Sequence, residues 1–128
     1  MANINVSIND LAAEITLAVK EYTEDVSAAI EKEVDVRSRE LAKNIRTDAP
    51  KKTGEYAKGW TRKKLRDSGQ TAYVVYNKAK PGLAHLLEHG HAKRGGGRVE
   101  GRPHIRPNTN RTEKQLVENI EKIIRNGG

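Results

Sequence analysis

Hydrophobic residues recur every three or four positions over the first third of the chain. The apolar stripe runs over 8–34 and resumes at Leu41 and Ile45. This spacing puts the apolar side chains on one face of a helix. No glycine or proline, the strongest helix breakers, occurs before Pro50. The pattern therefore predicts a long amphipathic helix over 8–48.

The stripe lapses across "DVRSRE" (35–40), so either one continuous helix or two helices joined there fits the pattern. Ser7 is placed to cap the first turn. A continuous helix of about 40 residues would be about 60 Å long. Such a helix overshoots the core of a domain this small, so we expect it to bend, break or pack on another chain.

The breakers and the alternation of apolar and polar residues divide the middle of the chain. Pro50 ends the first helix, and "GWTRKKLRDSGQTAYVVYNKA" predicts a β-hairpin over 60–78. A short helix is expected from Pro81 to the residue before Gly90.

The C-terminal part combines a glycine-rich segment with a last helix. Residues 90–102 are basic, rich in glycine and almost without apolar side chains, which predicts a mobile loop. "PHIRP" (103–107) predicts a short extended piece. A helix is expected over 110–126, with Thr112 and Gln115 as a capping box. Together these elements predict one α+β domain over 1–128 with a small antiparallel sheet.

Composition and charge add an expectation about partners. Leu, Ile and Val make up only 26 of 128 residues, and there is neither Phe nor Cys. So small an apolar supply fits either a subunit completed by its neighbours or a small monomer. Residues 1–36 hold 8 acidic and 2 basic side chains, whereas 37–128 hold 9 and 22. This asymmetry points to a polyanion, to an acidic protein surface, or to contact between opposite faces of two copies.

No disulfide or thiolate metal site is available without Cys. The chain shows neither a signal peptide nor a run of about 18 apolar residues, so we expect no membrane contact and a cytoplasmic location during synthesis.

One short motif suggests catalysis. His85, Glu88 and His89 spell the H-x-x-E-H pattern of a class of zinc peptidases. Such a site also needs a third protein ligand and a rigid helix. Here the helix is about two turns long, and its leucines provide a core face. We therefore expect a chance match, with no metal, no cofactor and no enzymatic activity.

Two basic segments suggest contact with DNA or with another subunit. They could neutralise phosphates without reading bases, although aromatic residues for stacking are few. The candidate residues are Arg62, Lys63, Lys64 and Arg66 in the predicted hairpin and Lys93, Arg94 and Arg98 in the predicted loop.

Three segments, taken in order, resemble a family of bacteriophage proteins. "APKKTGEYAKGW" resembles the P-x-x-T-G-x-L-x-x-S/G-W/I signature of tail components from long-tailed phages, the tail-completion and head–tail connector (neck) group. "LAHLLEHGH" resembles its Y-A-x-x-L/V-E-F/Y-G-T segment, and "GRPHIRPNTN" resembles its Q-P-F-L-R-P-A segment. The residues that match these motifs are Pro50, Thr53, Gly54, Trp60, Glu88, Gly90, Pro103, Arg106 and Pro107.

The resemblance implies a structural role in the virion. Proteins of that family form rings at the neck or the head-proximal end of the tail, around the channel through which DNA leaves. It implies a homo-oligomeric ring that contacts other neck and tail proteins. It also identifies "LLEHG" (86–90) as a family element, so that His85, directly before it, is incidental. The alternative from charge alone is a basic cytoplasmic domain that binds nucleic acid nonspecifically.

Overall fold

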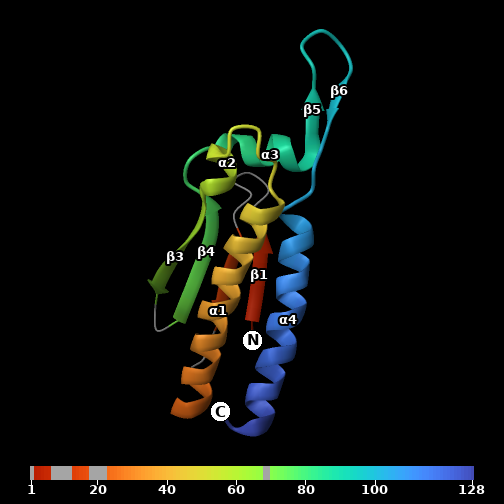
Figure 1. Ribbon diagram of the computed structural model, residues 1–128. Helices are drawn as coiled ribbons and strands as arrows, with labels where there is room; N and C mark the ends of the chain where they lie inside the picture. Colours follow the sequence, from red (N-terminus) through yellow and green to blue (C-terminus); the bar gives the residue numbers. More distant parts are fainter. Residues whose placement is uncertain (1, 7–12, 18–22, 68–69) are drawn as a thin grey trace.

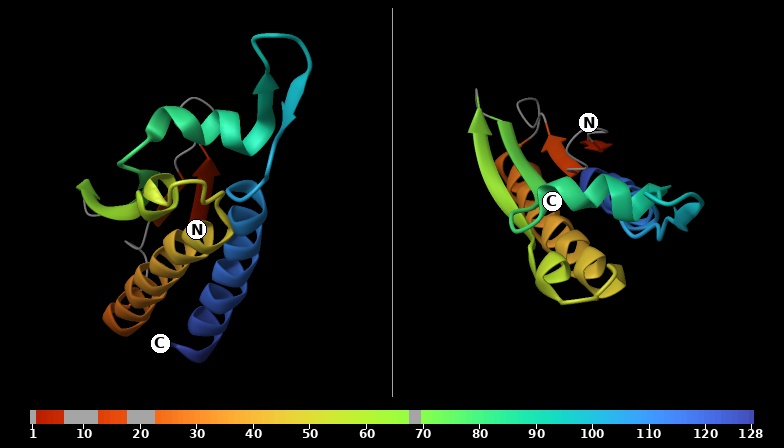
Figure 2. Two further views of the ribbon diagram at one scale, coloured as in Figure 1. Left: turned by 45° about the horizontal axis from the view of Figure 1, so that its top comes forward. Right: turned by 90° about the horizontal axis from the view of Figure 1, so that it is seen from above.

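Two long helices pack side by side against a four-stranded antiparallel sheet (Figures 1 and 2). The computed structural model describes residues 2–6, 13–17, 23–67 and 70–128. Helix α1 (Glu24–Asp48) lies against the last two strands of the sheet and helix α4 (Arg106–Asn126) lies against the first. The α+β class predicted from the sequence is confirmed.

The sheet joins the N-terminal strands to the predicted hairpin. Its strands are β1 (Ala2–Val6), β2 (Ala13–Leu17), β3 (Trp60–Asp67) and β4 (Gln70–Asn77), in the order β1-β2-β4-β3. The predicted hairpin is confirmed, with Trp60 opposite Asn77 at its open end. Strand β2 pairs with the other edge of β4, so that Ile15 lies opposite Tyr73.

The predicted helix over 8–48 is wrong in its first part. Residues 13–17 form strand β2, and α1 begins only at Glu24, where Thr23 caps it by accepting a hydrogen bond from the Val26 N–H at 3.3 Å. "AEITL" also alternates apolar and polar residues, and pairing with β4 selects that period of two over the helical period. Residues 7–12 and 18–22, including the proposed cap at Ser7, lie outside the described residues.

From Glu24 onward a single helix crosses the segment where the stripe lapsed. Ser38 is completely buried there, and its hydroxyl donates to the Asp35 carbonyl at 3.0 Å. A satisfied polar side chain thus replaces an apolar one on the inner face. The 25 residues of α1 are about 37 Å long. The helix is therefore much shorter than the length of about 60 Å expected for a continuous helix over 8–48.

Short elements connect the sheet to the helices at one end of the molecule. They are α2 (Glu55–Lys58), α3 (Pro81–His89), β5 (Gly90–Ala92) and β6 (Arg98–Glu100). The predicted helix from Pro81 is confirmed. The predicted irregular loop over 90–102 is wrong in part, because β5 and β6 pair with His91 opposite Val99. We call residues 90–100 the arm; it extends away from the rest of the molecule in both views (Figures 1 and 2). Its predicted mobility stays a prediction.

Helix α4 begins four residues before the predicted 110–126 helix and is not started by the expected capping box. Thr112 lies inside the helix and is buried. The predicted extended piece over 103–107 is therefore shorter, since Arg106 and Pro107 already belong to the first turn. The predicted end is confirmed at Gly127, which has a φ of 74° and donates its N–H to the Ile124 carbonyl.

The core lies between the two helices and the β3–β4 hairpin. The stripe predicted from the sequence is buried from Val26 to Ile45, and Leu116 and Ile120 of α4 face it. Trp60 closes the end of the core near α2 with 1% of its surface exposed. No helix in the described part of the chain is long and apolar enough to cross a membrane.

Candidate functional site

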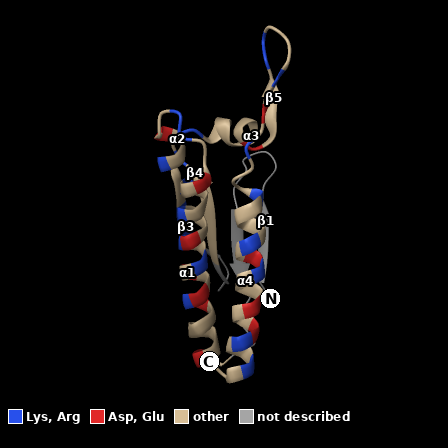
Figure 3. Cartoon of the chain, turned by 45° about the vertical axis from the view of Figure 1, so that its right-hand side comes forward, with Lys and Arg blue, Asp and Glu red and all other residues tan. Residues whose placement is uncertain are grey.

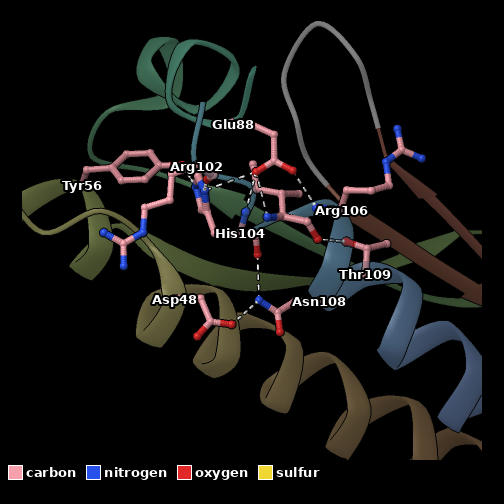
Figure 4. A network of polar contacts seen from close by, with 9 residues as sticks. Asp48, Tyr56, Glu88, Arg102, His104, Arg106, Asn108 and Thr109 are labelled. Atoms are coloured by element: carbon pink, nitrogen blue, oxygen red, sulfur yellow. Dashed lines mark hydrogen bonds and ion pairs between the residues drawn. The ribbon is translucent and has the colours of Figure 1, made fainter. Parts of the chain in front are cut away.

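The carboxylate of Glu88 is buried under the first turn of α4. Its Oε1 accepts hydrogen bonds from the backbone N–H groups of His104 at 2.8 Å and Ile105 at 2.9 Å. Its Oε2 accepts from the N–H of Arg106 at 2.9 Å (Figure 4). The first N–H groups of a helix have no partner within the helix, and the positive end of the helix dipole favours a negative charge there. Glu88 therefore caps α4 from a distance.

This cap fixes α3, the base of the arm and α4 relative to one another. Glu88 itself is only 4% exposed and belongs to α3. A second bond between the same segments runs from the Arg102 N–H to the Leu87 carbonyl at 2.8 Å. The arm leaves α3 and returns to α4 within this arrangement, so the cap sets the direction in which the arm points.

His104 extends the network to α2. Its side chain is completely buried, with Nδ1 2.7 Å from the Arg102 carbonyl oxygen and Nε2 2.5 Å from the Tyr56 hydroxyl. A carbonyl can only accept, so Nδ1 carries the proton and Nε2 accepts the hydrogen of Tyr56 in the neutral ring. Burial lowers the pKa of His104, against the opposing effect of the nearby Glu88 carboxylate, and burial raises the pKa of Tyr56.

The lowered pKa of His104 predicts a loss of stability in acid. The ordinary pKa is 6.5, and the folded state takes up the proton only at lower pH, so protons bind preferentially to the unfolded chain. The contribution of neutral His104 to the free energy of unfolding is fully present above about pH 6.5. It is lost as the pH falls toward the lowered pKa of His104. Thermal unfolding should show a midpoint that drops from pH 7.5 to pH 5.

The matched variants are His104→Asn and His85→Asn. Asparagine can still donate near the position of Nδ1 but does not titrate, so His104→Asn should flatten the dependence on pH. His85 is exposed, and its replacement should leave the slope as in the wild type. Equal slopes in all three proteins would mean that another group governs the acid response.

Asn108 connects the same network to the end of α1. Its Nδ2 donates to Asp48 Oδ2 at 2.9 Å and to the His104 carbonyl at 2.7 Å. The rings of Tyr56, Trp60 and His104 pack edge to face, with centroids 5.5 to 6.4 Å apart. Helices α1, α2, α3 and α4 are thereby tied together at one point.

The motif residues gather around this junction in two groups. Pro50, Thr53, Gly54 and Trp60 follow the chain from α1 through α2 into β3, and Glu88, Gly90, Pro103, Arg106 and Pro107 surround the step from α3 to α4. The contact between the rings of Trp60 and His104 brings the two groups together. The side chains of Pro103, Arg106 and Pro107 are exposed, and Arg106 takes part in the network through its backbone N–H alone.

Sequence reasoning missed the roles of Tyr56, His104, Asn108 and Asp48. Tyr56, His104 and Asn108 are buried although they lie in polar stretches, whereas Asp48 is exposed and joins the network through its contact with Asn108. One signal was available in the sequence. The segment "PHIRPNTN" has almost no apolar residues, so a turn held there needs hydrogen-bond partners for its backbone from other parts of the chain.

The zinc-peptidase pattern does not assemble into one site. His85 and His89 are exposed, with ring centroids 4.9 Å apart, whereas the Glu88 carboxylate is buried and bound to three backbone N–H groups. Among the described residues, no three His, Asp or Glu side chains are placed to share a metal ion.

The basic candidates lie in separate places and differ in their partners. Arg62 donates to the Asp35 carbonyl and the Ser38 hydroxyl, each at 2.9 Å, forms an ion pair with Asp35, and lies over the ring of Tyr73 at 4.8 Å. It holds β3 against α1 and is not free for DNA. Lys63 and Lys64 are exposed on β3, and the side chain of Arg66 lies outside the described residues.

The other three candidates are exposed on the arm. Lys93 and Arg94 lie near its tip, and Arg98 donates to the His89 carbonyl at 2.8 Å. Arg98 thus fastens the arm to the end of α3. Lys93 and Arg94 form no ion pair with a carboxylate in the described part of the chain.

Comparison with known proteins gives one match. The family model described as "Bacteriophage HK97-gp10, putative tail-component" matches residues 13–90, from β2 to the first residue of β5. No curated protein and no solved structure matches the chain significantly. The match covers more than half of the chain and includes the α1–α2 turn and Glu88, while the segment with Pro103, Arg106 and Pro107 follows it. The chain therefore belongs to the HK97-gp10-like family of bacteriophage tail components.

Proposed function

We propose that this tail component is a non-enzymatic subunit of the neck or the head-proximal end of the tail. In this proposal, copies of the chain form a homo-oligomeric ring that joins or completes the tail around the DNA channel. The ring contacts other neck and tail proteins, and the subunit passes from the host cytoplasm into the virion.

The observation that carries the proposal is the arm. Residues 92–100 are all exposed, including Val99 at 37%. Strands of three residues bury too little to be stable by themselves. The chain nevertheless holds the base of this ribbon through Glu88, Arg98 and the close approach of Gly90 to the main chain at Val99. An arm whose base is held, and whose remaining residues are exposed in the described part of the chain, supports contact with a neighbouring subunit.

A contact between the arm of one copy and another surface of the next copy is a head-to-tail contact, because it joins two different surfaces. A head-to-tail interface closes into a ring when the rotation between neighbours divides a full turn. The unequal charges along the chain favour the same geometry, because cations on the arm of one copy can meet carboxylates of the next.

The test is the mass of the protein in solution after the arm is shortened. In the variant, residues 93–97 are replaced by Asn-Gly, which forms a tight turn between the paired residues Ala92 and Arg98 and keeps the Arg98 bond to His89. We expect the wild type to give a discrete multimer by light scattering at about 0.15 M salt, and the variant to give a monomer with an unchanged thermal midpoint.

The control is Gly95→Ala at the tip, where an added Cβ meets nothing within 4 Å; it should assemble like the wild type. A chelator should leave the mass unchanged if no metal is involved. A wild type that is monomeric at every concentration, or a shortened variant that still assembles, would contradict the proposed ring contact.

A further inference from the structure

A basic hollow lies between the C-terminal half of α1 and helix α2. Its volume is about 280 Å³. Four cationic side chains and no carboxylate line it: Lys43, Arg46, Lys51 and Lys58. We define these four residues as the basic hollow.

No carboxylate in the described part of the chain forms an ion pair with the four cations of the hollow. Arg46 donates to the Trp60 carbonyl at 2.7 Å and Lys51 donates to the Ala49 carbonyl at 3.2 Å, so both are held by neutral acceptors. Lys43 forms no ion pair in the described residues, and the same holds for Lys58.

Two arginines elsewhere on α1 and β3 differ in this respect. Arg37 pairs with Glu33 at 2.8 Å, and Arg62 pairs with Asp35. The C-terminal end of α1 also attracts cations, but its dipole amounts to only about half a negative charge. Four cations exceed that charge several-fold, so helix capping accounts for only part of the cluster.

The position of the hollow favours a polyanion over a single small anion. It lies at the end of the molecule that also carries the arm, where Figure 3 shows blue segments on α2 and the arm with a few red ones among them, whereas acidic and basic residues alternate along α1 and α4. The start of α4 lies at the same end (Figure 1), and Arg102 just before it is exposed. One carboxylate or free phosphate would occupy the hollow alone, while a nucleic-acid backbone could also meet Arg102.

We propose that the basic hollow binds a backbone phosphate of double-stranded DNA. Arg46 is the fixed donor, because its guanidinium is already oriented by the Trp60 carbonyl and retains further N–H groups for an oxyanion. Lys43 and Lys58 are mobile point charges at its edge. The contact is independent of base sequence. The inference rests on the proposed function for its setting, since DNA passes through the channel of the proposed ring, and it adds that this end of each subunit faces the channel.

The test compares two double variants of the full chain that remove the same charge. The double variant Lys43→Gln with Lys58→Gln removes the two positive charges at the edge of the hollow and leaves Arg46 and Lys51 unchanged. Lys32→Gln with Lys122→Gln removes two exposed lysines from α1 and α4 outside the hollow. Binding of a fluorescent 20-base-pair duplex is measured by anisotropy from 50 to 200 mM salt.

We expect the hollow variant to bind at least about tenfold more weakly near 0.1 M salt, with a salt slope smaller by up to about one, since the hollow neutralises one phosphate. The matched variant should change affinity by no more than about twofold. Equal weakening in both variants would show attraction by net charge alone and overturn the site. Failure of the wild type to bind the duplex would overturn it as well.

Light scattering on the same proteins separates this inference from the proposed ring. If the hollow variant loses assembly but keeps DNA affinity, the hollow is a contact between subunits, and the DNA site is overturned while the ring stands. If the wild type is monomeric but only the hollow variant loses DNA affinity, the ring is contradicted and the phosphate site holds.

Discussion

Replacing Glu88 by alanine should lower the free energy of unfolding by about 3–5 kcal/mol. The change removes a buried carboxylate and leaves the N–H groups of His104, Ile105 and Arg106 without acceptors. Hydrogen bonds to a charged acceptor are worth more than neutral ones, and buried donors cannot recover their loss from water. Chemical denaturation with urea measures the change directly.

Two further variants isolate the cause. Glu88→Gln keeps one acceptor oxygen but turns an amide donor toward the remaining N–H group, so we expect a loss about half as large. Glu100→Ala removes an exposed carboxylate from β6 and should stay within about 0.5 kcal/mol of the wild type. A loss below about 1 kcal/mol for Glu88→Ala would mean that water replaces the carboxylate, and that the cap does not hold the α3–α4 junction.

The loss in Glu88→Ala should also appear as reduced assembly. The arm leaves α3 directly after Glu88 and returns to α4 at the residues that Glu88 caps. Loosening the cap therefore changes the direction of the arm before it unfolds the core. A Glu88→Ala protein that remains folded and still forms the wild-type multimer would count against this coupling.

Local patterns were sufficient for elements that end at strong breakers. Pro81 and Gly90 bound α3, and alternation around a turn identified the β3–β4 hairpin. These features depend on neighbours in the sequence, which is why they could be predicted without the structure. The apolar face of α1 from Val26 to Ile45 was predictable for the same reason.

The start of α1 could not be predicted because two periods fit the same residues. Ala13, Ile15 and Leu17 suit an alternating strand, while Ile15 also continues the helical stripe. What decides between them is the free edge of β4, a pairing between segments almost 60 residues apart. Tertiary pairing of this kind overrides local preference.

The candidate site shows the same limit more sharply. Glu88 was identified through its motif. The expectation that the leucines beside it form a core face is wrong for Leu83 and Leu86, which are each 39% exposed, whereas Ala84 is fully buried. That the Glu88 carboxylate would cap a helix beginning at Arg106 has no local signature, since a cap is sought within a few residues of the first turn. Thr112 and Gln115 satisfied that local pattern and were still wrong.

Replacing Gly90 by alanine should be the most damaging small change in the arm. Gly90 has a φ of 82°, and an added Cβ would lie 2.4 Å from the Val99 carbonyl oxygen and 2.7 Å from the Gly101 nitrogen. Both are main-chain atoms, so the clash cannot be relieved by turning a side chain. We expect the free energy of unfolding to fall by about 2–4 kcal/mol, from backbone strain and overpacking together.

Gly96→Ala is the matched control, because it separates the clash from the conformational strain. Gly96 also has a positive φ, of 100°, but an added Cβ there meets nothing within 4 Å. It should lose only about 1 kcal/mol and assemble like the wild type. Gly90→Ala must push β6 away from β5 at the base, so it should reduce the multimer measured by light scattering. Equal assembly in the two variants would mean that the arm does not need its fixed base, because a neighbouring subunit can bind it in any direction.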